Sequence, residues 1–287
     1  MRDSDQPSSP VFLNPDDDAE MEQAFKRARQ TFRFFWRELA WEYRRIIPAL
    51  GVASVKVAFS DPPGPQTAER GPAVEQMWIS EIEFDGQHVF GTLINKPNWL
   101  KTVHEGDNVK IRPTQVNDWM YSINDKVYGG YTVNLMRSRM GRKERAEHDA
   151  AWGLDFGSPD EIRIVPTDYV NEKAKPGGFF SRFKKDITPT PTVAEVAAKE
   201  HPMAINMKSS FEDFLKEDPT AITTTDDRGF TMLHQLALAG ATGCVQVLLK
   251  HGSDPNLRAK NGLTPLQLAK SLGWKQTIAA LESGGGS

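Results

Sequence analysis

The C-terminal part of the sequence repeats itself at a fixed spacing of 33 residues. The repeated positions and their counterparts are Gly229, Thr231, Leu233 and Gly240, then Gly262, Thr264, Leu266 and Gly273. A unit of about this length forms a turn and a pair of short helices that cannot bury its apolar face alone, so successive copies stack. The spacing therefore predicts a small all-α domain over residues 201–283.

The residues within each copy resemble the ankyrin repeat. Asp227–His234 (DRGFTMLH) resembles the start of that repeat, Gly252–Asn256 (GSDPN) resembles its end, and Gly262–Leu266 (GLTPL) restates the start. The resemblance implies a binding function, since ankyrin repeats bind other molecules and do not catalyse reactions. Two clear copies are fewer than the three or so that a stable stack needs. We expect His201–Leu215 to form a half-repeat that covers the first face.

The resemblance also indicates which residues would contact a partner, because ankyrin repeats bind through their turn tips and inner helices. In this sequence the tip positions are Arg228, Phe230, Lys260, Asn261 and Leu263. Phe230 and Leu263 lie between the Gly and the Thr of each copy. We expect them to be exposed apolar side chains that a partner covers on binding.

The first half of the chain predicts an α+β domain. Asn14 and Pro15 are typical of a helix start, and apolar residues then follow at steps of three and four until Pro48. Alternating apolar residues next predict strands, joined by a type I′ turn at Asp85-Gly86 and a hairpin turn at Asn124-Asp125. The expected strands are 55–59, 77–84, 89–94, 109–111, 119–123 and 127–128, and the expected short helices are 131–140 and 143–152.

An ordered series of short motifs in this half resembles the YegJ-like family of bacterial domains of unknown function. The motifs are EQMWI from Glu75, GTLIN from Gly91 with Pro97, Gly106-Asp107, VNDW from Val116 and GGYT from Gly129. The resemblance covers about residues 18–166. It implies no established chemistry, although some members of the family occur in settings that suggest neutralisation of toxins.

These features divide the chain into five segments. We expect a disordered N-terminus at 1–13, the YegJ-like domain at 14–168, a linker at 169–200, the repeats with their cap at 201–283 and a flexible tail at 284–287. The linker contains Phe179–Lys185 (FFSRFKK). Its phenylalanines are expected to dock on a domain, and the alternative is a contact with an anionic membrane or a nucleic acid.

Composition excludes several classes of protein. A net charge of −3 does not suit a general nucleic-acid binder, and neither a secretory signal nor a membrane-spanning stretch is evident, so we expect a cytoplasmic protein. The single cysteine, Cys244, excludes an internal disulfide and is expected to pack in a helical core. The six histidines lack ligand spacing. No metal and no cofactor are expected.

No catalytic motif is recognisable. Asp118-Trp119 is the best candidate for a special position, because a carboxylate beside a large aromatic is costly to bury without a partner. Asp118 could cap a turn while Trp119 fills the core, or the two could form a ligand pocket with Tyr131. A basic cluster at residues 137–145 could bind phosphate or be a solvated helix face.

The sequence therefore predicts a non-catalytic bacterial protein that binds another protein. The concrete hypothesis is an immunity protein that neutralises a cognate toxin by occluding its active site. The alternative is an enzyme or small-ligand receptor with a site near Asp118 and Trp119. A nucleic-acid or membrane partner is not expected.

Overall fold

The computed structural model of the chain describes residues 18–62, 74–170 and 190–286. The expected disordered N-terminus and most of the expected linker, including Phe179–Lys185, lie outside these residues. The described chain forms two compact units. The sheet unit contains residues 18–30, 50–84 and 88–162, and the repeat unit contains residues 31–49, 85–87 and 163–286, each without the gaps given above.

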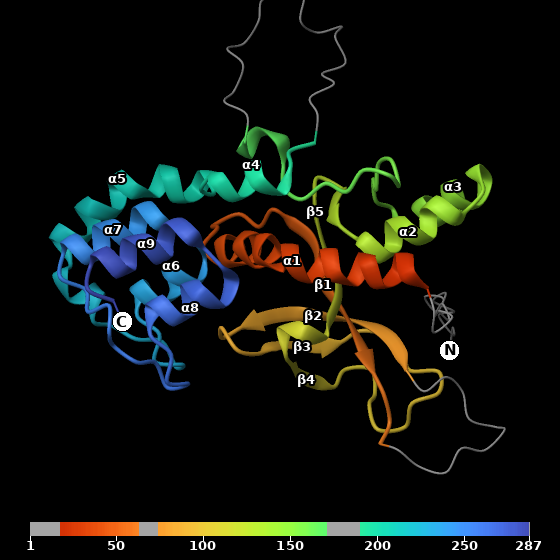
Figure 1. The fold of residues 1–287 in the computed structure, drawn as a ribbon, viewed down its shortest axis with the longest axis horizontal. Helices are drawn as coiled ribbons and strands as arrows, with labels where there is room; N and C mark the ends of the chain where they lie inside the picture. Colours follow the sequence, from red (N-terminus) through yellow and green to blue (C-terminus); the bar gives the residue numbers. More distant parts are fainter. Residues whose placement is uncertain (1–17, 63–73, 171–189, 287) are drawn as a thin grey trace, which may run out of the picture. The chain divides into compact units, whose positions relative to one another are not determined.

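The sheet unit is built on six strands in the order β4-β3-β2-β1-β5-β6, and every neighbouring pair is antiparallel (Figure 1). This confirms the predicted α+β class. The strands are β1 (Leu50–Phe59), β2 (Glu75–Phe84), β3 (Val89–Leu93), β4 (Asn108–Ile111), β5 (Val116–Ile123) and β6 (Lys126–Gly129). Val55 of β1 lies opposite Ile79 of β2 and Trp119 of β5. All three are fully buried, so the alternation of the sequence matches the pleat.

The two predicted hairpin turns differ in the structure. Asn124 and Asp125 have φ values of 48° and 62°, as a type I′ turn requires. At the β2–β3 turn, however, Gly86 has a φ of 91° while Asp85 does not have a positive φ, so the predicted type I′ turn is wrong there. The Asp85 carboxylate accepts a hydrogen bond from the Gln87 amide (2.8 Å), and this Asx turn supports a longer connection.

Helix α1 (Ala19–Glu42) is shorter than the predicted helix. Asp18 caps it, because its Oδ1 accepts a hydrogen bond from the Met21 amide (3.1 Å), and the predicted start at Asn14 lies outside the described residues. In the sheet unit the first half of α1 is tied to β5 by the bond from Trp119 Nε1 to the Ala28 carbonyl (3.0 Å). The short helix η1 (Pro113–Gln115) follows β4. The helices α2 (Tyr131–Arg139) and α3 (Arg142–Trp152) follow β6.

The repeat unit consists of short helices stacked in pairs. They are η2 (Thr167–Tyr169), α4 (Val193–Ala198), α5 (Pro202–Glu217), η4 (Pro219–Ile222), α6 (Met232–Leu238), α7 (Thr242–Lys250), α8 (Pro265–Leu272) and α9 (Lys275–Ser283). Thr231 and Thr264 cap α6 and α8 by accepting hydrogen bonds from the His234 and Gln267 amides. Helix α6 packs on α8, while α7 packs on α5 and α9. The repeated threonines therefore begin the inner helix of each pair.

Two elements cover the first face of the repeats. Helix α5 is one of them, with Phe211 and Leu215 buried among residues of α6 and α7. The second half of α1 also contributes, because Trp41 is 0% exposed and belongs to the same apolar cluster. The sequence indicated the first of these elements and not the second.

Arginines of α1 lie against the C-terminal ends of helices in the repeat unit. Arg33 Nη1 donates to the carbonyl of Gly273, which caps α8 (3.3 Å), and Arg37 Nη1 donates to the carbonyl of Lys199, which caps α4 (3.0 Å). Cations are favourable at the negative end of a helix dipole. These bonds tie residues 31–42 to the repeats.

In the described ranges, no helix has both the length and the apolar composition needed to cross a bilayer.

Candidate functional site

The first repeat tip presents Arg228 above a buried Phe230. The Phe230 ring is 1% exposed, stacks on His234 with 5.5 Å between centroids, and lies under the Arg228 guanidinium at 4.8 Å. Its amide donates to Asp226 Oδ1 (2.8 Å). The expectation of an exposed Phe230 is therefore wrong, because the ring packs on the inner helix. Arg228 keeps 40% of its side chain exposed, beside Asp226 at 3.1 Å.

The second tip combines an exposed cation with two covered side chains. Lys260 is exposed, and its amide donates to the Arg228 carbonyl (3.0 Å), which joins the two tips. Asn261 Nδ2 donates to the Asp85 carbonyl (2.8 Å). Leu263 is half-buried, and a Cβ at Gly86 would lie 3.0 Å from it. Within the repeat unit the turn at residues 85–87 thus covers part of this tip.

The Asp118 carboxylate is buried and accepts four hydrogen bonds. Its Oδ1 accepts from the amides of Trp119 (2.8 Å) and Tyr131 (2.9 Å), and its Oδ2 accepts from the amide (2.7 Å) and the hydroxyl (2.6 Å) of Thr132. The last three donors belong to the first turn of α2, whose N-cap is Gly130 and has no side chain. Asp118 therefore caps α2 from the neighbouring strand β5.

Lys56 completes this cluster. Its Nζ donates to Thr132 Oγ1 (2.9 Å) and lies 5.0 Å from the centre of the Trp78 ring. Burial raises the pKa of Asp118 and lowers the pKa of Lys56, since each ion loses hydration, and their mutual attraction opposes both shifts. The cluster forms a chain from ammonium to hydroxyl to carboxylate, in which Asp118 and Thr132 are buried and Lys56 is partly buried.

Trp119 and Tyr131 pack beside this carboxylate. The two rings meet edge to face with 5.8 Å between centroids, and Trp119 also stacks on Tyr121 at 6.1 Å. Thus the structure brings the three residues of the alternative pocket together inside the core. A groove of about 610 Å³ does lie nearby, between the start of α1, the helix α2 and residues 159–162. Tyr131 lines it, whereas Asp118 and Trp119 do not.

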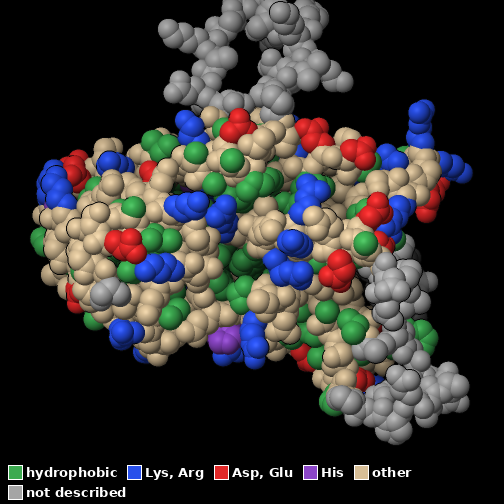
Figure 2. Space-filling view, viewed as in Figure 1, with side chains coloured by type: hydrophobic (Ala, Val, Ile, Leu, Met, Phe, Trp, Pro, Cys, Tyr) green, Lys and Arg blue, Asp and Glu red, His purple; other side chains and the backbone are tan. Residues whose placement is uncertain are grey.

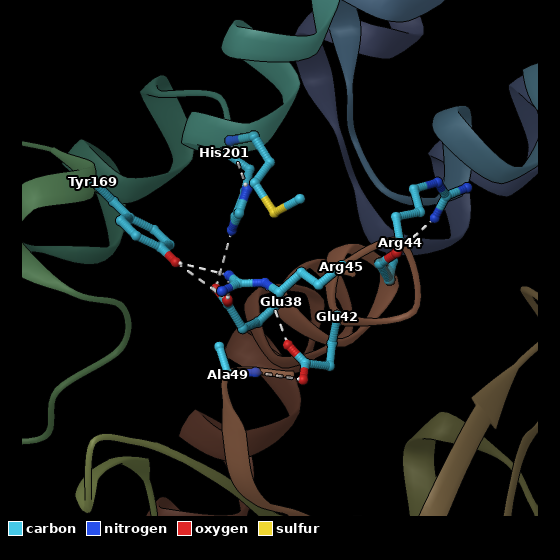
Figure 3. Close-up of polar contacts among 9 residues, drawn as sticks. Glu38, Glu42, Arg44, Arg45, Ala49, Tyr169 and His201 are labelled. Carbon is cyan, nitrogen blue, oxygen red and sulfur yellow. Dashed lines mark hydrogen bonds and ion pairs between the residues drawn. The ribbon is translucent and has the colours of Figure 1, made fainter. Parts of the chain in front are cut away.

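A buried polar network that the sequence did not indicate lies in the repeat unit (Figure 3). Glu38 Oε1 accepts hydrogen bonds from Arg45 Nη2 (2.9 Å) and from the Tyr169 hydroxyl (3.2 Å). Glu38 Oε2 lies 3.2 Å from His201 Nε2, and both side chains are 1% exposed. The partners come from α1, η2 and the start of α5. No local motif could have indicated a site whose members are so far apart in the sequence.

The hydrogen bonds of His201 define which ring nitrogen carries the proton. Its Nδ1 accepts a hydrogen bond from the Met203 amide (3.1 Å), so the proton resides on Nε2, which donates to Glu38. Burial lowers the pKa of His201, although Glu38 opposes this shift. Burial also raises the pKa of Tyr169, and the Glu38 carboxylate adds to that effect. Glu38 and His201 lie at the buried centre of the network, Arg45 and Tyr169 are partly exposed at its edge, and the four side chains join α1 to the repeats as a structural clamp.

Other predicted features have structural roles in the described part of the chain. No group of three or more potential metal ligands occurs there. Cys244 is buried, and burial raises the pKa of its thiol to about 11. Of the basic cluster, Arg137 binds both carboxylate oxygens of Asp149, and Arg139 binds Asp18. Figure 2 shows Lys and Arg side chains together with Asp and Glu side chains across the visible face.

Two protein families match the chain. Residues 18–156 match a family described as an uncharacterised protein conserved in bacteria (DUF2314), and residues 215–269 match ankyrin repeats. These matches agree with a sheet unit of unknown chemistry and a repeat unit of the type that binds proteins.

Individual relatives support the same assignment. A protein of Neisseria meningitidis serogroup B, whose name identifies it as an ankyrin repeat protein, is 37% identical over 96% of this chain and 97% of its own length. The uncharacterised YegJ of Escherichia coli is 30% identical over 25% of this chain and 48% of its own length. The chain therefore belongs to the bacterial YegJ-like (DUF2314) proteins that carry C-terminal ankyrin repeats. The human ASB11 ankyrin domain has a TM-score of 0.26, 21% identity, and coverage of 31% of this chain and 41% of its own.

Proposed function

We propose that this protein is a cytoplasmic, non-catalytic binding protein that holds a protein partner through its ankyrin repeats. The observation that carries the proposal is the pair of repeat tips, which are joined by the bond from the Lys260 amide to the Arg228 carbonyl and carry these two cations at the surface. Asn261 and Leu263 flank them, and Phe230 supports Arg228 from below. The bonds that hold the two tips in place before binding reduce the conformational entropy that binding would cost.

The concrete form of the proposal is an immunity protein that neutralises a cognate toxin by occluding its active site. The two cations at the tips suit an acidic patch on such a toxin, and long-range attraction would speed association. A specific contact of this kind buries more than about 1,000 Å² in total. The settings of some YegJ-like proteins support this form.

The experiment is co-expression of the full chain with each small protein encoded beside its gene. We expect one of these proteins to arrest growth when it is expressed alone. When the chain is also present, that protein should be harmless and should co-purify with the chain at equal stoichiometry. Arg228→Glu together with Lys260→Glu should weaken this binding by at least about tenfold, because the two new carboxylates would repel the acidic patch on the partner. Lys275→Gln, which changes an exposed cation on α9 and away from the tips in sequence, is the matched control.

The outcomes separate the two forms of the proposal. A stoichiometric partner that is not toxic would remove the immunity role and keep the binding role. Binding that the charge-reversal pair leaves unchanged would move the interface away from the tips. The alternative function, an enzyme or small-ligand receptor near Asp118 and Trp119, has less support, because four donors already occupy the carboxylate.

A further inference from the structure

An apolar groove of about 430 Å³ lies between α5 and α6 in the repeat unit. Its walls are Met207, Phe211 and Phe214 of α5 and Met232 and Leu236 of α6, and Arg44, just after α1, also lines it. Phe214 is 41% exposed at the rim, while Phe211 and Leu236 are buried beneath. The groove is therefore continuous with the apolar core at its floor and open to solvent at its mouth.

Arg44 is the only cation that lines the groove, among the described residues, and it has no acidic partner. Its Nη1 donates to the Ala40 carbonyl (2.5 Å) and its Nη2 to Gln235 Oε1 (3.0 Å), both neutral acceptors. In Figure 3 the Arg44 side chain points away from Glu38 and the rest of that network. Burial lowers the pKa of Arg44. Arg44 is partly buried, and a cation that has lost hydration without gaining a counter-ion retains part of that cost.

We propose that this groove binds a monocarboxylate with an apolar body, whose carboxylate pairs with Arg44 and whose body lies between the methionine and phenylalanine side chains. The volume falls within the range of about 300–1,000 Å³ that is usual for small-molecule pockets. Methionine walls adapt to unbranched chains and to rings alike. The few lining residues are too small a surface for a protein helix, which needs an interface of more than about 1,000 Å².

The polar groups of the groove define which part of the ligand is recognised. Arginine pairs with a carboxylate through two parallel hydrogen bonds, and Ser210 and Gln235 are the other polar side chains in the lining. A second anionic group would face apolar walls and is disfavoured. An alcohol of the same length lacks the charge-assisted bond, so we expect it to bind at least about tenfold more weakly.

The test is calorimetric titration of the full chain with decanoate, with decanol as the neutral probe. We expect one decanoate per chain and weaker binding of decanol. Arg44→Gln removes the charge and should weaken decanoate binding by about tenfold or more without changing decanol binding, whereas Arg44→Lys should retain part of the affinity. Lys275→Gln, which removes an exposed cation far along the sequence, is the matched control.

A second variant guards against loss of folding in the Arg44 series. Phe214→Asp changes a partly exposed rim residue and should weaken decanoate more than decanol, because it adds a like charge. The proposal is overturned if decanoate does not bind at millimolar concentration, if decanol binds equally well, or if the Arg44 variants have no effect. It is independent of the protein-binding role, since the tip variant Lys260→Glu should bind decanoate normally.

Discussion

Asp118 shows how one side chain can replace a missing helix cap. Because Gly130 precedes α2 and carries no side chain, the carboxylate of β5 satisfies the first amides of that helix. In Asp118→Asn, an NH₂ group could take the place of the Oδ2 atom that accepts hydrogen bonds from the amide and the hydroxyl of Thr132. Hydrogen-bond donors would then face each other. We expect the free energy of unfolding to fall by about 3 kcal/mol, measured by urea denaturation.

The control for this substitution is Asp125→Asn. Asp125 is exposed in the β5–β6 turn with a φ of 62°, a conformation that asparagine adopts at least as readily. We expect no measurable loss of stability. Equal losses in the two variants would show that Asp118 does not act as a cap.

The buried histidines predict a pH dependence of stability. Burial lowers the pKa of both His201 and His234 in the folded chain, so below about pH 6.5 the unfolded chain binds protons that the folded chain does not. Stability therefore rises with pH between the lowered pKa and about 6.5, and acidification below 6.5 lowers it. Each histidine contributes at most about 1.4 kcal/mol per pH unit.

Urea unfolding at several pH values between 5 and 8 measures this slope. His201→Asn keeps an acceptor for the Met203 amide and removes one titrating group, so the slope should decrease even though the variant is less stable at every pH. A slope that His201→Asn does not alter would place the titration elsewhere.

At the scale of elements, a single glycine fixes the junction between β6 and α2. Gly129 has a φ of 78°, and a Cβ there would overlap the carbonyl oxygen and the ring of Trp119. Gly129→Ala should cost about 3 kcal/mol or more in a thermal or urea unfolding experiment, since it combines backbone strain with a clash. Gly106 has a φ of 89°, and a Cβ added there would have no atom within 4 Å. Gly106→Ala should therefore cost only the backbone strain of about 1–2 kcal/mol.

The sequence predicted the elements well where local pattern decides them. Alternating Val55, Val57 and Phe59 specified β1, and the paired threonines at 231 and 264 specified where α6 and α8 begin. It failed where a side chain overrides the pattern, as at Asp85, whose bond to the Gln87 amide changes the turn. Phe230 was placed at the surface because a repeat pattern does not show that the ring stacks on His234.

At the scale of the whole molecule, helix α1 contributes to both compact units. Its residues up to Gln30 belong to the sheet unit, and its residues from Thr31 belong to the repeat unit. The apolar residues at steps of three and four predicted the helix. They could not indicate the partners, because Glu38 meets His201 and Arg44 meets Gln235 across long separations in the sequence. The buried network and the Arg44 groove were missed for this reason.

This sharing predicts that a substitution in α1 will loosen helices far along the chain. Trp41 packs in one cluster with Phe211 of α5 and Val247 of α7, so Trp41→Ala leaves a cavity there and should cost about 3–5 kcal/mol. In hydrogen–deuterium exchange we expect faster exchange in α5, α6 and α7, while β5 keeps its protection, because local stability follows local packing. Trp152→Ala, at a position 36% exposed, is the matched control and should leave these helices protected. If Trp41→Ala accelerated exchange in α1 alone, the repeats would be stable without that helix, and α5 by itself would be the cap of the stack.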